Sequence, residues 1–295
     1  MITRDDGETA SGPTGCTNLN RENESQSDKL PAVLESDHAD GGLSFFNGDC
    51  RIRVANCFEL RDRAYRFIYE IYQGLGYTGS NGSRRWLTVY DALPDTTTLI
   101  AENKKGDLAG VLTLVFDSAM GLPGDSMFKV QLDSLRNDGA RLCESMSFAT
   151  AENTRGSIRT IAGLFYCGYL LAWRAKKATH WTTNVIEKHE RFYCRNLLFE
   201  RVGPVNNCSR AQGLPVVLLV LPFDLPNMLR KVRRIFPLSM LNYSDTEEAE
   251  ISSRVNELLT PMSTDEFCRF FSENSRVYRS ASGEQRQILK KLYAF

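Results

Sequence analysis

Residues 140–150 read ARLCESMSFAT, and this stretch gives the main clue to the fold. Its apolar and small polar residues, uninterrupted by Gly or Pro, are typical of a strand. Alternation along a strand places Arg141, Cys143 and Ser145 on one face and Leu142, Glu144 and Met146 on the other. A carboxylate among apolar neighbours costs free energy unless it is paired or used chemically. Two interpretations of Glu144 therefore stay open: a structural ion pair with an arginine, or a proton acceptor whose pKa is raised by burial.

The segments on either side of this strand alternate between helix and strand patterns. Apolar residues recur at helical spacing in 58–73, and Asn-Lys-Lys-Gly-Asp at 103–107 separates two strand-like runs as a hairpin turn does. The predicted strands are 51–55, 96–102, 108–116, 140–150, 180–185 and 215–223. The predicted helices are 58–73, 126–137, 158–177 and 188–197. This order predicts a mixed α/β (α+β) fold with an antiparallel hairpin near its start.

Composition divides the chain into three parts. Residues 1–44 contain nine acidic and three basic residues, a net charge of −6, and no aromatic residue, so we expect a disordered acidic tail. Residues 45–224 carry the mixed α/β pattern. Residues 225–295 show helical stripes and predict a helical C-terminal extension. Because the whole chain has 36 basic and 36 acidic residues, everything after the tail carries a net charge of +6.

The overall composition excludes several classes of protein. A zero net charge over 295 residues argues against a broadly basic nucleic-acid-binding surface. Eight cysteines without a CxxC pair argue against a disulfide scaffold or a zinc ribbon, and three histidines exclude a histidine-rich metal centre. The N-terminus has no apolar core of a secretory signal, and the apolar stretch 158–173 is shorter than the roughly 20 residues that span a bilayer. We therefore expect a cytoplasmic protein with no transmembrane segment and no metal site.

The predicted helix 188–197 carries two residues that could move protons. Tyr193 could protonate a leaving group, or it could serve only in packing. His189 could act as a base, or it could be a structural histidine with a satisfied hydrogen bond.

Basic residues gather in the middle of the chain. Nine Lys or Arg stand against three Glu between Arg155 and Arg201. Arg174, Lys176 and Lys177 end the long predicted helix, and Arg230 and Lys231 belong to a second group. Cations near a helix C-terminus are favourable for the helix dipole alone. A solvated surface and a docking site for an acidic macromolecule both stay open.

Several spaced blocks resemble the N-acyl amino acid synthase family. They are LTVYDALPDTTTLIAE (87–102), GVLTLVFDSAMGLP (110–123), LDSLR (132–136), GARLCESMS (139–147), HERFYCRNLLF (189–199) and GLPVVLL (213–219). They occur in the family's order, and the resemblance covers about residues 50–225. It implies a GNAT fold, a mixed and mostly antiparallel sheet with helices on both faces. It also implies a relationship to the acyl-homoserine-lactone synthases.

The resemblance implies an activity and two catalytic residues. Members of this family move a long fatty acyl group from acyl carrier protein to the α-amine of an amino acid. Glu144 matches the general base on the central splayed strand. Tyr193 matches the tyrosine that GNAT enzymes use as a general acid, although Leu198 stands where a glycine is usual. Glu187-Lys188-His189 also departs from the family's Pro-Arg-His.

This activity needs further groups around Glu144. The tetrahedral oxyanion needs a donor, most simply a backbone N–H within 145–148, so Ser145, Ser147 and Phe148 are predicted to bind substrate. A guanidinium suits the amino-acid carboxylate, and we expect Arg85 or Arg141 in this role.

The absence of a coenzyme A-binding motif bears on the identity of the acyl donor. The GNAT pyrophosphate loop [Q/R]xxGxG/A is absent after 140–150, which favours the phosphopantetheine thioester of acyl carrier protein over free coenzyme A, with no bound cofactor. Docking of an acidic carrier protein would use a basic surface, predicted at Arg174, Lys176, Lys177, Arg230 and Lys231. We expect no nucleic-acid partner.

Two other functions remain compatible with the sequence. An autoinducer synthase would make an acyl lactone from S-adenosylmethionine on the same fold. A non-catalytic binding or regulatory module could also retain the GNAT fold, and replacement of Glu144 by Gln distinguishes this reading from an enzyme.

Overall fold

The computed structural model describes residues 34–36, 43–47, 50–151, 158–223, 259–273 and 275–294. It describes the backbone alone for 34–36, 43–47, 158–159, 272–273 and 275. All these residues belong to one unit of the chain, Pro31–Phe295. The predictions for the rest of residues 1–44 and for 224–258 lie outside the described residues.

A single sheet organises the described residues. Its strands are β1 (Leu34–Ser36), β2 (Leu43–Asn47), β3 (Cys50–Val54), β4 (Thr97–Asn103), β5 (Leu108–Phe116), β6 (Leu142–Thr150), β7 (His180–Ile186), β8 (Glu200–Arg201), β9 (Asn206–Cys208) and β10 (Leu214–Pro222). The order across the sheet is β1-β2-β3-β4-β5-β6-β7-β10-β8, with β9 also paired to β10. Every described pairing is antiparallel except β6 with β7, which is parallel. The prediction of a mixed, mostly antiparallel sheet is confirmed.

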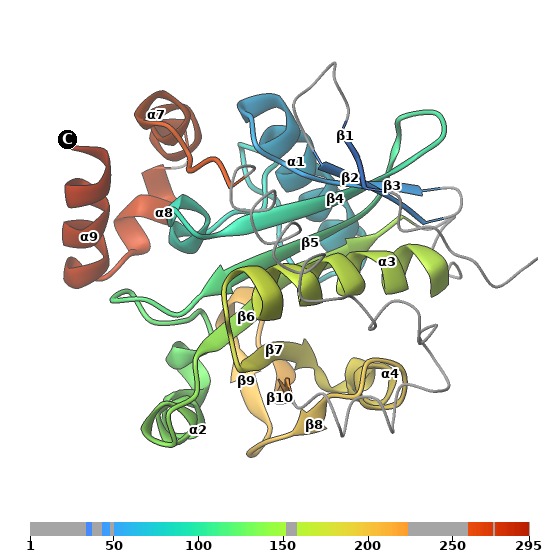
Figure 1. The fold of residues 1–295 in the computed structure, drawn as a ribbon. Coiled ribbons are helices and arrows are strands. Elements are labelled where there is room, and N and C mark those ends of the chain that lie inside the picture. Colours follow the sequence, from blue (N-terminus) through green and yellow to red (C-terminus); the bar gives the residue numbers. More distant parts are fainter. Residues whose placement is uncertain are drawn as a thin grey trace, which may run out of the picture. The chain divides into compact units, whose positions relative to one another are not determined.

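Helices cover both faces of this sheet (Figure 1). They are α1 (Phe58–Gly74), α2 (Asp125–Asn137), α3 (Ile158–Tyr169), α4 (Glu190–Asn196), α7 (Thr264–Glu273), α8 (Ser275–Ser280) and α9 (Gly283–Tyr293). Alternation along β5 separates the faces, because Val111 packs in one cluster with Ala64 of α1. On the other face, Leu112 lies against Gly168 of α3, where a Cβ would approach its side chain to 3.0 Å. Helix α3 continues into a π-helix, Leu170–Ala175.

Strands β1, β2, β8 and β9 were not predicted from the sequence. Strand β1 lies within residues 1–44, the predicted acidic tail, and β2 begins at Leu43 near its end. Strand β2 pairs with β3 and β1 pairs with β2, and this backbone pairing needs no apolar alternation in the sequence. Strands β8 and β9 have two and three residues, too few to show a period of two.

The β6–β7 pair is where the sheet opens. The two strands pair from Leu142 and His180 to Ser145 and Thr183, and their pairing then ends. Immediately beyond, the β5–β6 register shifts between Thr113 and Leu114, which leaves Met146 as an extra residue in β6. The later part of β6 therefore pairs with β5 alone, as expected for a central splayed strand.

The C-terminal helices pack onto the α/β part of the chain. Phe270 stacks on Phe58 of α1 with 4.5 Å between ring centroids, and Tyr293 Oη donates a hydrogen bond of 2.5 Å to the Ala92 carbonyl. Arg61 of α1 forms a 2.6 Å ion pair with Glu266 of α7. The predicted helical extension is confirmed over its described part. Across all the described residues, no helix combines the length and apolar character needed to cross a membrane.

Candidate active site

Glu144 lies on β6 one residue before the last β6–β7 pair. Its side chain is almost fully buried, with 2% of the residue exposed. One carboxylate oxygen, Oε2, accepts a hydrogen bond of 2.8 Å from the Gly124 backbone N–H. The other, Oε1, accepts a hydrogen bond of 2.9 Å from Nδ2 of Asn184 on β7. Within the described ranges no Lys or Arg forms an ion pair with Glu144, so the structural ion pair that the sequence left open is not present.

Neutral donors leave the charge of Glu144 uncompensated in a buried position. Burial, with a smaller contribution from the nearby Asp125 carboxylate, raises the pKa of Glu144 to about 8. The Gly124 N–H, the Arg210 guanidinium and Asn184 act in the opposite direction. A carboxyl group with a pKa about 8 gains and loses its proton near neutral pH, which suits a general base.

Position 124 needs glycine because there is no room for a side chain, not because of its backbone conformation. Its φ of −68° is accessible to any residue, so no left-handed conformation is involved. A Cβ at this position would lie 2.9 Å from Oε2 of Glu144 and 2.8 Å from Nδ2 of Asn184. A side chain here would therefore displace either the carboxylate or the amide that holds it. The glycine just before the predicted helix 126–137 was a signal that the sequence analysis passed over.

Tyr90 connects the loop before Gly124 to the C-terminal extension. Its hydroxyl donates a 3.3 Å hydrogen bond to the Leu122 carbonyl and accepts one of 3.1 Å from Nε2 of Gln285 on α9. Burial, together with the charge of Glu144, raises the pKa of Tyr90 to about 12. Helix α9 thus reaches the loop that supplies a hydrogen bond to Glu144.

Two aromatic residues, Tyr72 and Trp86, form a platform along the later part of β6. Trp86 Nε1 donates a 3.2 Å hydrogen bond to Oγ of Ser147. The Tyr72 ring packs edge-on against Trp86, with 5.1 Å between centroids. The Tyr72 hydroxyl accepts a hydrogen bond from the Phe148 N–H at 3.2 Å and donates one to its carbonyl at 3.1 Å. These bonds replace, at Phe148, the neighbouring strand that β6 has lost.

The predicted substrate-binding residues on β6 separate onto two faces. Ser147 shares a face with the platform through Trp86. Phe148 turns its ring to Phe165 of α3, with 5.1 Å between centroids. Ser145 is buried, and its Oγ has no hydrogen-bond partner among the described residues. Ordinary alternation places Ser147 and Phe148 on opposite faces, and the extra residue Met146 breaks the alternation between Ser145 and Ser147.

Tyr193 lies in an aromatic cluster. Its ring packs against Phe165 and Phe199, with centroid distances of 5.9 Å and 5.7 Å. Burial raises the pKa of its phenol well above the ordinary value. No described contact joins Tyr193 to Glu144. Leu198 has a φ of 64°, so the turn after Tyr193 keeps the left-handed conformation that a glycine would adopt there.

His189 is held by a hydrogen bond. Its Nε2 lies 2.7 Å from the Tyr77 hydroxyl. Partial burial and the neighbouring charge of Lys188 lower the pKa of His189. Both features favour a neutral imidazole that fixes the loop after β7.

The two arginines predicted to bind the amino-acid carboxylate lie in different surroundings. Arg85 is buried and forms a 2.5 Å ion pair with Asp62 of α1. Binding a substrate carboxylate there would require this ion pair to break. Arg141 lies just before β6, where the sequence had placed it in the strand, and it is exposed. Its Nε donates a 2.6 Å hydrogen bond to the Lys177 carbonyl.

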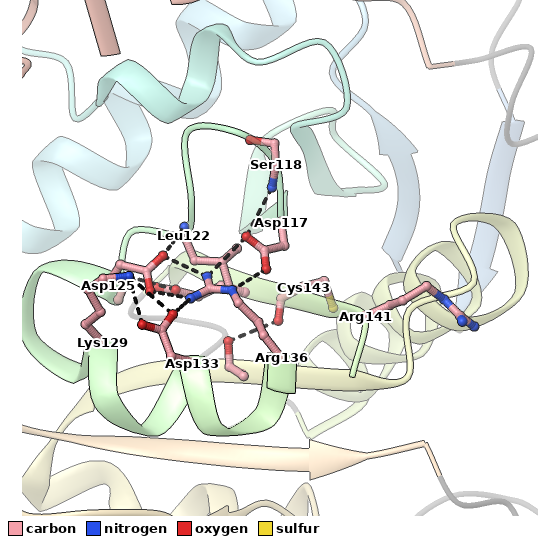
Figure 2. Close-up of polar contacts among 12 residues, drawn as sticks. Asp117, Ser118, Leu122, Asp125, Lys129, Asp133, Arg136, Arg141 and Cys143 are labelled. Carbon is pink, nitrogen blue, oxygen red and sulfur yellow. Dashed lines mark hydrogen bonds and ion pairs between the residues drawn. The ribbon is translucent and has the colours of Figure 1, made fainter. Parts of the chain in front are cut away.

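A polar cleft of about 830 Å³ lies at the end of β5 and the start of β6. Arg136 of α2 dominates it, with ion pairs of 2.6 Å to Asp117, 2.7 Å to Asp125 and 2.8 Å to Asp133. Figure 2 shows these carboxylates converging on Arg136, while Arg141 points away from them. The carboxylates raise the pKa of Arg136 far above its ordinary value. Glu144 does not line this cleft.

The described residues of the predicted docking surface end the long helix. Lys176 forms a 2.7 Å ion pair with Asp95, and the Arg174 guanidinium lies 3.6 Å from the centre of the Trp173 ring. Lys177 is exposed. The other two predicted docking residues, Arg230 and Lys231, lie outside the described residues.

Comparison with known proteins adds to this geometry. The family model described as N-acyl amino acid synthase FeeM matches residues 63–222. The structure of FeeM, an N-acyl amino acid synthase from uncultured soil microbes, has 24% sequence identity and a TM-score of 0.53, covering 62% of this chain and 94% of that chain. TofI, in a ternary complex with an inhibitor and MTA, has 15% identity and a TM-score of 0.49, covering 64% and 98%.

BjaI, a CoA-dependent acyl-homoserine lactone synthase with SAM and isopentyl-CoA, has 11% identity and a TM-score of 0.43, covering 62% and 87%. No curated protein matches the chain. The likeness to the FeeM structure supports the GNAT-like fold, and the match to the family model includes Glu144 and Tyr193.

Proposed function

Because this chain belongs to the N-acyl amino acid synthase FeeM family, and is an acyltransferase of that kind, we propose that it acylates the α-amine of an amino acid with a long-chain fatty acyl group from acyl carrier protein. The observation that carries the proposal is Glu144, a buried carboxyl group held by neutral donors at the opening of the sheet. A carboxyl group in this setting has the basicity that an attacking amine requires.

Glu144 removes one proton during the transfer. The amine nitrogen attacks the thioester carbon, a C–N bond forms, and the nitrogen gives a proton to the Glu144 carboxylate. The C–S bond then breaks, and the departing thiolate takes up a proton to leave a free thiol. The products are the N-acyl amino acid and the thiol of the carrier. A pKa of about 8 keeps Glu144 able both to accept this proton and to release it afterwards.

The oxyanion of the tetrahedral intermediate needs a hydrogen-bond donor within 145–148. The Phe148 N–H is already bonded to the Tyr72 hydroxyl. Met146 is the extra residue that the β5–β6 register leaves over, two residues after Glu144. We therefore assign the oxyanion to the Met146 backbone N–H.

Tyr193 assists the leaving thiolate as a neutral donor. Burial keeps its phenol protonated at every pH at which the enzyme would work, since its pKa lies well above the ordinary value. A neutral phenol donates a hydrogen bond to a thiolate without losing its own proton. The retained turn at Leu198 supports the position of Tyr193 that the family resemblance implies.

Acyl carrier protein is the proposed donor because a basic surface is available at the end of the long helix. Arg174, Lys176 and exposed Lys177 belong to this surface. Electrostatic docking of an acidic protein weakens as salt screens the charges. A carrier-protein donor should therefore show a KM that rises with ionic strength, whereas coenzyme A thioesters would respond less.

Incubating the purified full chain with acyl donors and acceptors tests the function. Palmitoyl-acyl carrier protein and palmitoyl-coenzyme A are supplied separately with an equimolar mixture of the twenty amino acids, and products are identified by mass spectrometry. We expect N-acyl amino acids from the carrier-protein donor. An acyl lactone formed from added S-adenosylmethionine, or no product from any combination, would contradict the proposal.

Replacing the base tests the role of Glu144. Glu144→Gln keeps the shape and one of the two accepting oxygens but cannot accept the proton, so kcat should fall by about 10²–10⁴. Glu70→Gln is the matched control, because Glu70 is an exposed residue of α1 whose one ion pair among the described residues is with Arg84 at 3.3 Å. Unchanged product formation by folded Glu144→Gln would contradict the assignment of Glu144 as the general base.

A further inference from the structure

The acceptor amino acid brings a carboxylate to within two bonds of the nitrogen that attacks. The cation that binds this carboxylate must therefore lie close to Glu144. Most arginines near the site are already paired, Arg61 with Glu266, Arg85 with Asp62 and Arg136 with three aspartates. Arg210 is different.

Arg210 lies on a short 3₁₀ helix, Ser209–Ala211, between β9 and β10. The residue is exposed, and among the described residues its guanidinium makes neither an ion pair nor a hydrogen bond. Its one described contact is with Trp86, whose ring centre lies 5.1 Å from the guanidinium carbon. The positive charge of Arg210 also lowers the pKa of Glu144 across the space between them.

The Trp86 ring fixes where this guanidinium can lie. Trp86 donates a hydrogen bond to Ser147, three residues after Glu144 on β6, and Tyr72 packs edge-on against its ring. A guanidinium above an aromatic face is attracted to the ring while its N–H edges stay open for a partner. A carboxylate is the partner that matches those edges, through two parallel N–H···O bonds.

We propose that Arg210, placed by the Trp86 ring, binds the α-carboxylate of the acceptor amino acid while Glu144 takes a proton from its α-amine. This inference rests on the proposed function and specifies it further: the enzyme selects amines that carry a carboxylate on the neighbouring carbon. Sequence analysis missed Arg210 because its distance from Glu144 in the chain gives no local pattern.

Arg210→Ala tests the proposal by a change of specificity. The substrates are the amino acid that gives most product from the mixture of twenty, and the amine obtained by removing its carboxyl group. For the wild-type protein we expect a clear preference for the amino acid. Arg210→Ala should raise KM for the amino acid by about 10- to 100-fold, the loss of a charged hydrogen-bond pair, and leave KM for the amine unchanged.

Two controls separate this result from a folding defect. Arg269→Ala removes another exposed arginine that lies over an aromatic ring, 3.3 Å from the centre of Phe58, and should change neither KM. Arg210→Lys keeps the charge without the planar fork and should give an intermediate KM. Arg210→Ala should also move the pH midpoint of kcat/KM upward, because removal of the cation raises the pKa of Glu144.

Three outcomes are distinguishable. A wild-type protein that acylates no amino acid overturns the proposed function and this inference with it. A wild-type protein that acylates an amino acid, combined with an Arg210→Ala variant that loses amino acid and amine equally, overturns the inference alone. An unchanged KM for the amino acid in Arg210→Ala also overturns it.

Discussion

Two carboxylates lie next to Gly124, Glu144 as the acceptor of its N–H and Asp125 as the following residue, and their environments differ strongly. Glu144 is buried and held by the Gly124 N–H and the Asn184 amide, with no ion pair among the described residues. Asp125, the next residue after Gly124, accepts hydrogen bonds of 2.7 Å from both terminal nitrogens of Arg136. Burial among neutral donors raises the pKa of Glu144, whereas hydrogen bonds from Lys129 and Arg136 lower the pKa of Asp133. The difference shows how one turn supports both a reactive group and a structural one.

The pH dependence of stability should have opposite signs in the two regions. Glu144 has a folded pKa of about 8, above its ordinary value of 4.5, so the folded chain holds a proton that the unfolded chain loses. Its contribution to stability is therefore lost as pH rises through about 8. Lys129 and Arg136 lower the pKa of Asp133, so the contribution of that region is present above the unfolded pKa and lost as pH falls.

The largest expected effect comes from Glu144→Gln. Removing an acidic group whose ionised form is disfavoured by burial should raise the free energy of unfolding at pH 8 by about 1–4 kcal/mol. Urea denaturation at pH 6, 7 and 8 measures this, and the gain should grow with pH. Asp125→Asn is the matched control, and it should lose stability because Arg136 loses a charged partner. A variant of Glu144 that is destabilised at pH 8 would argue against the raised pKa.

Gly124→Ala should come next. The added methyl group would lie 2.9 Å from the Glu144 carboxylate and 2.8 Å from Asn184, so the base must move. We expect kcat to fall by about 100-fold and the free energy of unfolding to fall by about 1–3 kcal/mol. Steady-state kinetics and thermal unfolding measure both. Gly82→Ala provides the control, since a Cβ there meets nothing within 4 Å; an equal loss in both variants would count against a specific role.

Arg136→Ala should affect stability more than chemistry. It leaves Asp117, Asp125 and Asp133 together without their shared cation, and we expect a loss of about 1–3 kcal/mol at pH 7. The loss should shrink as pH falls and the aspartates become protonated. Denaturant titrations at pH 4 and 7 compare the two conditions. A kcat that falls as far as in Gly124→Ala would show that this cluster belongs to the catalytic machinery.

Gln285→Ala should have the smallest effect. Gln285 acts as a positioning residue, through the Tyr90 hydroxyl and the Leu122 carbonyl, on the loop that holds Glu144. We expect kcat to fall about 2- to 5-fold, with KM for the acyl donor unchanged, because one partly buried hydrogen bond contributes about 1 kcal/mol. Gln287→Ala on the exposed side of α9 is the control. Identical kinetics in both variants would confine α9 to packing.

The sequence was sufficient to place Glu144 because the relevant signal is local. Alternation along 140–150 set its face, and its cost among apolar neighbours marked it for attention. The paired hairpin β4–β5 and the helices α1 and α2 also follow from periods of two and 3.6 residues within single segments. These features depend on neighbours along the chain.

The residues that surround Glu144 could not be found in the same way. Gly124, Asn184 and Arg210 come from a loop, from β7 and from a short 3₁₀ helix, and the fold alone brings them to β6. The extra residue Met146 breaks the alternation between Ser145 and Ser147, and Ser147 contacts Trp86. Arg85 reads as a free cation in the sequence because its partner Asp62 lies on a different element.

The pH dependence of kcat/KM, compared between the wild-type protein and Glu144→Gln, tests the role of Glu144 most directly. In the wild-type protein we expect kcat/KM to rise with pH through a midpoint of about 8, because the carboxylate form is the base. In Glu144→Gln the residual rate should lack this midpoint. A wild-type midpoint near 4.5, or the same midpoint near 8 in both proteins, would contradict the assignment of Glu144 as the general base.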